Sequence, residues 1–336
     1  AWGGGGTRGG GERAGERLLE PRRERLLEYD VARLVSQLDQ PARPVVGLLT
    51  PLPMAFGFDR FGQRMTEPWA IVAQMQQLFT VRQVDPSATR IPDELDVLML
   101  VHPKHLPDAT LYALDQYVLR GGALLAFVDP SAEQDPSGAD PLHPFGGDCP
   151  ASDLGPLAAA WGVRFYPGLV VADARHALSV AGATGPVRHL GFLGFDAAAL
   201  DGDDPITASL GLVNFATAGF LAADPQAATR LEPLVVSSDE AAPLAAARFA
   251  EAIGPEALYE GFAPDGERYV LAARVVGRPA SAFPDGPPTG GEAPADGHLA
   301  AAAADARIVL VADSGLLAGP LWTRPRSFLG QRTLEA

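Results

Sequence analysis

Short apolar runs alternate with amphipathic segments through the first half of the chain. Uninterrupted apolar runs, which are typical of strands buried on both faces, occur three times, at 45–49, 97–101 and 123–128. Apolar residues recur with helical spacing after Pro68 and after Pro107, and Gly121-Gly122 ends the second of these helices. This alternation predicts an α/β fold, with a mostly parallel sheet and helices on both faces.

The second half is less regular. Strands are expected at 169–171, 231–236, 269–276 and 308–312. A helix is expected at 243–253, and residues 190–204 are interpreted as irregular. Residues 278–306 are so rich in Pro, Gly and Ala that they are interpreted as a linker, that is, a long Pro/Gly-rich insertion in the fold.

The two ends of the chain differ from the middle. Residues 1–16 have the composition of a flexible Gly-rich tail, without the apolar core of a signal peptide, and residues 17–40 have the pattern of an amphipathic helix. We therefore expect a first α/β unit at 41–150 and a second α/β portion, of the same or an adjacent domain, at 151–277. The linker follows, and residues 307–336 form the last strand and a truncated C-terminal segment.

Charge and cysteine content exclude several classes of protein. Lys and Arg number 26 against 41 Asp and Glu, for a net charge of −15, so neither nucleic acid nor an anionic lipid surface is expected as the main partner. The single cysteine, Cys149, excludes a disulfide within the chain and a cysteine-based zinc cluster. Residues 205–223 carry no charge, but their Thr, Ser and Asn favour a buried segment over a membrane span.

Motifs that carry chemistry are missing from the sequence. It contains no GxxxxGK[ST] phosphate loop, no GxSxG nucleophile elbow and no HExxH zinc motif. We therefore assign no catalytic residue, no cofactor and no metal.

Three polar residues follow apolar strands: His102, Asp129 and Asp313. In an open α/β sheet, ligands gather at the carboxyl edge of the strands, so these residues are candidates to line one crevice. A hydrolase or amidotransferase-like enzyme would use the same three. The alternative interpretation is structural: each Asp accepts backbone N–H groups where its strand turns, and His102 caps its loop.

The long loop at 51–67 carries three aromatic residues, Phe56, Phe58 and Phe61. A loop in this position is a candidate surface for a partner, a glycan or another polymer. Equally, its aromatic rings are expected to pack back onto the sheet.

Long collinear segments resemble one family. They include PVVGLLTPLPM, PWAIVAQMQQLFTVRQVD, IPDELDVLMLVHPKHLPDATLYALDQYVLRGGALLAFVDP, DDPITASLGLVNFATAGFL and RSFLGQR. These segments are similar to the auxiliary component of gliding-motility-associated ABC-type transport systems. The resemblance implies a flavodoxin-like or glutamine-amidotransferase-like α/β region without hydrolytic residues of its own.

The resemblance also implies partners and a location. It implies separate ABC permease and ATPase subunits, and an extracytoplasmic domain held to the membrane by terminal helices. Because the chain departs from the family pattern at both ends, we expect a fragment whose membrane association uses segments missing from this chain. The sequence thus predicts a non-catalytic binding or coupling component of a transport system.

Overall fold

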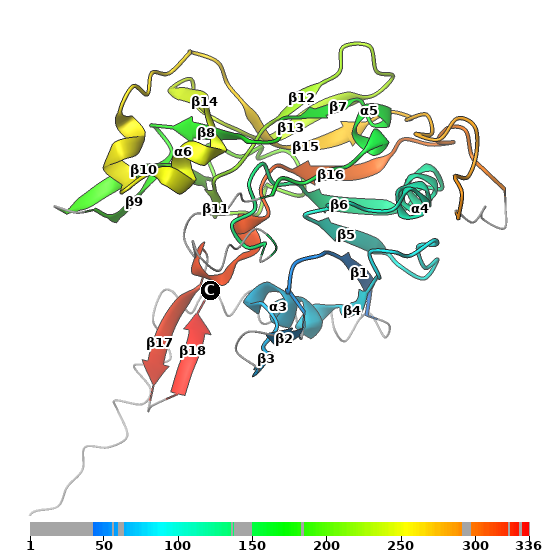
Figure 1. Cartoon of the computed structure of the whole chain (residues 1–336), viewed down its shortest axis with the longest axis horizontal. Coiled ribbons are helices and arrows are strands. Elements are labelled where there is room, and N and C mark those ends of the chain that lie inside the picture. Colours follow the sequence, from blue (N-terminus) through cyan, green and yellow to red (C-terminus); the bar gives the residue numbers. More distant parts are fainter. Residues whose placement is uncertain are drawn as a thin grey trace, which may run out of the picture.

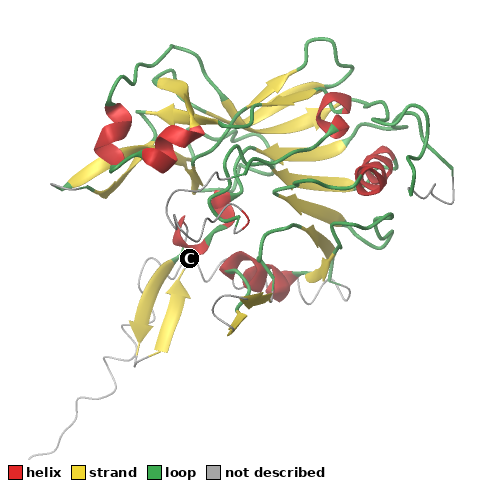
Figure 2. Cartoon of the chain, in the orientation of Figure 1, coloured by secondary structure: helices red, strands yellow, loops and turns green. Residues whose placement is uncertain are grey.

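The computed structural model describes residues 43–55, 57–59, 64–135, 137, 150–182, 185–290, 297–321, 323–328 and 331–335. The expected Gly-rich tail at 1–16 and amphipathic helix at 17–40 lie outside these residues. Figure 1 shows one long sheet, with a second group of strands beside its upper part and a two-stranded hairpin projecting from the body. Helices are few and short compared with the strands (Figure 2).

The sheet has nine strands in the order β4-β1-β5-β6-β16-β15-β12-β7, with β13 also paired to β15. Its first five strands are parallel, and the others pair antiparallel. The strands of the parallel part are β1 (Val45–Leu49), β4 (Thr80–Gln83), β5 (Val97–Val101), β6 (Ala123–Phe127) and β16 (Arg307–Val311). Those of the antiparallel part are β7 (Val163–Phe165), β12 (Leu221–Ala223), β13 (Arg230–Val236) and β15 (Val270–Val276).

This sheet confirms the α/β class. Numbered along the chain, the five parallel strands run 2-1-3-4-5, one of the two common orders of doubly wound sheets. The flavodoxin-like assignment stays a prediction, because four of the nine strands do not follow that plan. The long segment between β6 and β16 supplies all four of them.

Helices cover both faces of the parallel part. On one face, α4 (Asp108–Leu119) and α5 (Pro156–Ala160) contribute Leu114 and Leu157 to a core with the strand residues Leu98 and Leu100. On the other face, α3 (Ala70–Leu78) buries Val72 among residues of β1 and β5. The strands β1, β5 and β6 are apolar throughout because each side chain, whichever way it points, meets one of these two cores.

The second group of strands packs against the antiparallel part. It consists of β8 (Leu169–Asp173), β9 (Ala177–Ala181), β10 (Pro186–Asp196), β11 (Leu212–Ala216) and β14 (Ala241–Ala245), paired as β11-β10-β9 and β14-β8. Phe195 and Phe215 from this group share a core with Leu234 and Leu271 of the large sheet. The remaining elements are α6 (Ala246–Glu251), the short helices η3 (Pro255–Tyr259), η4 (Gly315–Leu317) and η5 (Gly319–Leu321), and the hairpins β2 (Gly57–Asp59)–β3 (Arg64–Thr66) and β17 (Arg324–Phe328)–β18 (Gln331–Glu335).

Two expectations about this region were wrong. Residues 190–196 are not irregular but belong to β10, where Gly191 and Gly194 allow close packing. A Cβ on Gly191 would lie 2.5 Å from the Phe249 ring, and one on Gly194 would lie 2.6 Å from Leu178. The expected helix at 243–253 begins only at Ala246, because the preceding residues pair with β8 as an antiparallel strand.

The Pro- and Gly-rich segment interpreted as a linker lies against helix α4. Asp115 and Gln116 of α4 are buried and bind its backbone. Asp115 accepts hydrogen bonds from Ser281 Oγ (2.7 Å) and from the Ala282 amide (2.9 Å). Gln116 accepts from the Leu299 amide at 2.8 Å. These contacts fix the described parts of the segment, 278–290 and 297–306, on the outer face of the helix.

Candidate functional site

The three polar residues predicted to meet at the carboxyl edge do lie together. His102 directly follows β5, while Asp129 and Asp313 come two residues after β6 and β16. Because these three strands are parallel neighbours, their exit loops meet at one edge of the sheet. All three side chains are buried, with exposed fractions of 0%, 2% and 0%.

The two aspartates join neighbouring loops through backbone hydrogen bonds. Asp129 Oδ2 accepts from the Ser314 amide (3.0 Å) and the Ser314 hydroxyl (2.6 Å), and its Oδ1 accepts from the Ser131 amide (2.9 Å). Asp313 accepts from the Ala216 amide (2.7 Å) and the Leu316 amide (3.1 Å). The loops after β6, β11 and β16 are therefore tied to one another by two carboxylates.

Burial shifts the pKa values of Asp129 and Asp313. It raises the pKa of Asp129, although the hydrogen bonds from Ser314 and Ser131 act in the opposite direction. Burial raises the pKa of Asp313 well above its ordinary value, and the neighbouring charge of Asp129 raises it further. Two buried carboxyls this close resist losing both protons.

His102 belongs to a chain of three side chains. Its Nδ1 lies 2.8 Å from Ser152 Oγ, and its Nε2 lies 3.1 Å from Asp135 Oδ2. Ser152 Oγ also accepts a hydrogen bond from the Asp129 amide at 2.8 Å. The network is satisfied when the serine hydroxyl donates to Nδ1 and Nε2–H donates to the carboxylate. Lys104 also binds Asp135, and its hydrogen bond contributes to holding the pKa of that carboxyl at about 2, against the opposing effect of burial.

Serine, histidine and aspartate are also the residues of the catalytic triad in many hydrolases. In this protein, however, the serine is buried. Ser152 is 2% exposed, and its oxygen is held by the Asp129 amide inside the fold. A serine nucleophile has to reach a substrate carbonyl and be activated by its base. In the observed conformation, Ser152 has no such access. The hydrogen bonds of His102 with Ser152 and Asp135 join the loop after β5 to the chain that follows β6.

Two residues beside this network have unusual backbones. His102 has φ 48° and Thr217 has φ 53°. Positive φ is rare for a residue other than glycine and most unusual for a β-branched one. The surrounding hydrogen bonds maintain both, including one from the Thr217 amide to the Gly191 carbonyl at 2.8 Å. Such strain collects at functional sites, which makes this edge the leading candidate site.

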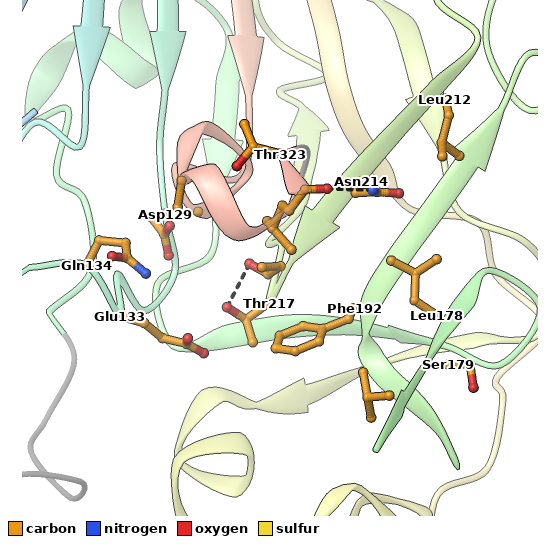
Figure 3. Close-up of a pocket in the computed structure, with 15 residues that line it drawn as sticks. Asp129, Glu133, Gln134, Leu178, Ser179, Phe192, Leu212, Asn214, Thr217 and Thr323 are labelled. Carbon is orange, nitrogen blue, oxygen red and sulfur yellow. Dashed lines mark hydrogen bonds between the residues drawn. The ribbon is translucent and has the colours of Figure 1, made fainter. Parts of the chain in front are cut away.

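An open pocket of about 640 Å³ lies next to the buried network (Figure 3). The loop after β6 contributes Asp129 and Glu133, and Thr217 follows β11. The opposite wall is apolar and comes from the β11-β10-β9 sheet, with Leu178, Phe192 and Leu212. His102 and Asp313 do not line the pocket and lie behind it. The remaining described lining residues are Gln134, Ser179, Val180, Asn214, Ala216, Gly315, Ala318, Leu321 and Thr323.

The aromatic loop cannot be placed in the same way. Phe56 and Phe61 lie outside the described residues, and Phe58 belongs to β2, which pairs with β3. Its proposed contact with a partner or glycan stays a prediction. Within the described ranges, no three His, Cys, Asp or Glu side chains are grouped so that they could hold a metal ion. No helix of the described chain has the length and apolarity needed to cross a membrane.

Sequence reasoning missed several residues of the site. Glu133 and Ser152 flank a long loop, and nothing in their local pattern distinguishes them from other loop residues. Thr217 lies in the uncharged segment 205–223, for which the sequence predicts a buried segment and no site residue. The sequence marks Gly315 only by its place directly after the VADS strand end. In the structure, a Cβ at this position would lie 3.0 Å from Asp313 Oδ1.

Comparison with known proteins gives one match. The family model described as "ABC-type uncharacterized transport system" matches residues 43–336. Searches of curated proteins and of solved structures returned no significant match.

Proposed function

Because the chain belongs to the family of ABC-type uncharacterized transport systems, we propose that it is a non-catalytic auxiliary component that works with a separate permease and ATPase. The sequence supports this division of labour, because it has no phosphate loop with which to hydrolyse ATP itself. The chain would then act by contact, through loops that the fold holds at its surface.

The observation that carries this proposal is a loop that exposes apolar side chains. Within residues 204–211, here called the apolar loop, Ile206 is 43% exposed and Leu210 39%. The loop nevertheless has a fixed conformation. Asp204 accepts hydrogen bonds from the Ile206 and Ala208 amides, and it forms an ion pair with Arg274 at 2.7 Å.

Apolar side chains held in water by an ordered loop are typical of a surface that contacts another protein. The acidic residues Asp201 and Asp203 beside the loop are exposed, which disfavours an anionic membrane surface as the partner. A permease loop with apolar and basic residues fits both features. We therefore propose that the apolar loop contacts the permease.

Co-purification tests the proposal. The tagged protein is expressed with the permease and ATPase encoded beside it and is recovered from membranes in mild detergent. We expect both subunits in the eluate. Replacing Ile206 and Leu210 together by Ser is expected to reduce the recovered permease about tenfold or more, because each buried apolar side chain contributes roughly 1.5–3 kcal/mol.

Ile253→Ser is the matched control. Ile253 is fully exposed and belongs to the segment between α6 and η3, outside the apolar loop. This variant should retain normal recovery. Absence of both subunits with the unchanged protein would contradict the proposed function, and equal losses in the two variants would contradict the assignment of the apolar loop.

A hydrolase is the second candidate, and the Ser152–His102–Asp135 chain is the observation that favours it. A fluorophosphonate probe tests it directly, because such probes label activated serines. We expect no labelling at Ser152, since the side chain is buried. Labelling that disappears in Ser152→Ala would replace the non-catalytic proposal.

The finer features of the family resemblance are part of the same proposal. We propose that the domain lies outside the cytoplasm, attached to the membrane, and serves a transporter of the gliding-motility-associated type. Protease accessibility in intact spheroplasts tests the location. The identity of the adjacent genes tests the type of transporter.

A further inference from the structure

The pocket beside the sheet edge combines an acidic end with an apolar wall. In Figure 3, the Asp129 and Glu133 side chains lie on one side and Phe192 and Leu178 on the other, with Thr217 between them. A volume of about 640 Å³ is within the range of small-molecule sites, and a mostly apolar wall with a few polar groups is their usual composition.

The polar groups at the acidic end are mainly acceptors. Among the lining residues that the structure describes there is no Lys, Arg or His. Neither Asp129 nor Glu133 has an ion pair with Lys or Arg within the described chain. Asp313 adds a further carboxyl directly behind the pocket wall, next to Gly315.

Asn214 lines the same pocket, on the side opposite Asp129 and Glu133 (Figure 3). Its amide nitrogen donates to the Leu321 carbonyl at 2.7 Å, which leaves the side-chain oxygen as an acceptor. That oxygen is buried and has no hydrogen-bond partner among the described atoms. Buried acceptors normally have a donor, and an unpaired one costs about as much as a lost hydrogen bond.

We infer that this pocket binds a small organic cation, whose ammonium or guanidinium group lies beside Asp129 and Glu133 and whose apolar part packs against Phe192 and Leu212. An ammonium or guanidinium group carries several N–H donors and no acceptor, which complements a site rich in acceptors. The apolar wall excludes a bare metal ion as the natural occupant, because a metal ion gains nothing from Phe or Leu side chains.

The electrostatics of the empty pocket agree with this inference. Burial of the carboxyl raises the pKa of Glu133, and the nearby charge of Asp129 raises it further, whereas a hydrogen bond with Thr217 lowers it; the residue as a whole is exposed. Negative charge is therefore unfavourable here without a counter-ion. A bound cation would supply the missing positive charge. The site does not depend on the transport role proposed above.

The experiment compares two probes of equal chain length, n-hexylammonium and n-hexanol, by ligand-observed NMR with the full chain in an amine-free buffer at neutral pH. The probes differ in charge and donor number but share the apolar part. We expect n-hexylammonium to bind about tenfold more tightly than n-hexanol, which corresponds to about 1.4 kcal/mol.

Two variants separate the charged and the apolar contributions. Glu133→Gln should weaken n-hexylammonium about fivefold or more and leave n-hexanol unchanged, whereas Leu212→Ser should weaken both probes. Asp239→Asn removes an exposed carboxylate outside the pocket and is the control for net charge. Glu133 lies in a turn after β6 and is exposed as a residue, so its substitution is expected to leave the fold intact.

The inference is overturned if the two probes bind with equal affinity, or if neither binds up to about 10 mM. It is also overturned if Glu133→Gln and Asp239→Asn weaken n-hexylammonium by the same factor, because the attraction would then come from overall charge. None of these outcomes depends on the result of the co-purification experiment.

Discussion

Removing the buried carboxyl of Asp313 tests whether the sheet edge is a structural junction. Asp313→Ala leaves the amides of Ala216 and Leu316 without their acceptor. A buried donor left unpaired costs about 1–3 kcal/mol, so two of them give roughly 2–6 kcal/mol. The substitution also removes an unfavourable neighbour of Asp129, which offsets part of the cost. We therefore expect a loss of about 2–4 kcal/mol in the free energy of unfolding at mildly acidic pH.

The loss should depend on pH in a defined direction. The pKa of Asp313 in the folded protein lies above its value in the unfolded chain. Between these two values the folded protein holds a proton that the unfolded chain has released, so the stability contributed by Asp313 falls as pH rises. The slope is at most about 1.4 kcal/mol per pH unit for one proton. The destabilisation caused by Asp313→Ala should therefore be largest below the ordinary Asp pKa of about 4 and shrink as pH rises.

Urea unfolding, followed by circular dichroism at several pH values, measures this difference. Asp201→Ala is the control, because the exposed Asp201 carboxylate accepts a single turn hydrogen bond from the Asp203 amide. The control should cost less than about 1 kcal/mol, with no comparable trend. A loss for Asp313→Ala no larger than the control, or one that grows with pH, would refute the structural role assigned to this carboxyl.

Three further substitutions test other parts of the account. Asp135→Asn should lower the free energy of unfolding by about 1–3 kcal/mol, because the charged hydrogen bonds with Lys104 and His102 are lost. Since the folded-state pKa of Asp135 is about 2, below its ordinary value, this difference should be present above about pH 4 and disappear as pH falls towards 2 in acid titrations. Asp115→Ala should release the segment at 278–290, seen as faster hydrogen exchange of its amides with little change in the strands of the sheet. Unchanged exchange would show that the segment is held elsewhere. Leu157→Ala should cost about 2–5 kcal/mol in chemical denaturation, because Leu157 is fully buried between α5 and the sheet. A loss below about 1 kcal/mol would mean that neighbouring side chains fill the cavity, or that α5 does not pack on the sheet as described.

The parallel part of the fold could be predicted from the sequence because its strands and helices are marked by local patterns of apolar residues. The strands at 45–49, 97–101 and 123–127 are bounded by turns and apolar throughout, and α4 spans the predicted residues from Asp108 to Leu119. Once the strands were known to be parallel, the convergence of His102, Asp129 and Asp313 followed from geometry. Their functional role is a separate question, and it stays a prediction.

The opposite wall of the pocket could not be predicted. It comes from β9, β10 and β11, which are consecutive along the chain and pair antiparallel. The glycines of β10 lower its apparent strand propensity, and their reason for being there is the approach of Phe249 and Leu178. The apolar loop was misjudged for a related reason. The sequence shows that Ile206 and Leu210 are apolar. Whether they are buried depends on the neighbouring elements of the folded chain, which the sequence does not show.

Site-specific photocrosslinking tests the central claim, that the chain acts by contact with its transporter. A photoreactive residue is placed at position 210 in the apolar loop or at position 253, which is more exposed, and the cells also carry the adjacent permease and ATPase. We expect a crosslink to the permease from position 210 and none from position 253. Equal crosslinking from both positions, or none from position 210 when the permease is present and folded, would contradict it.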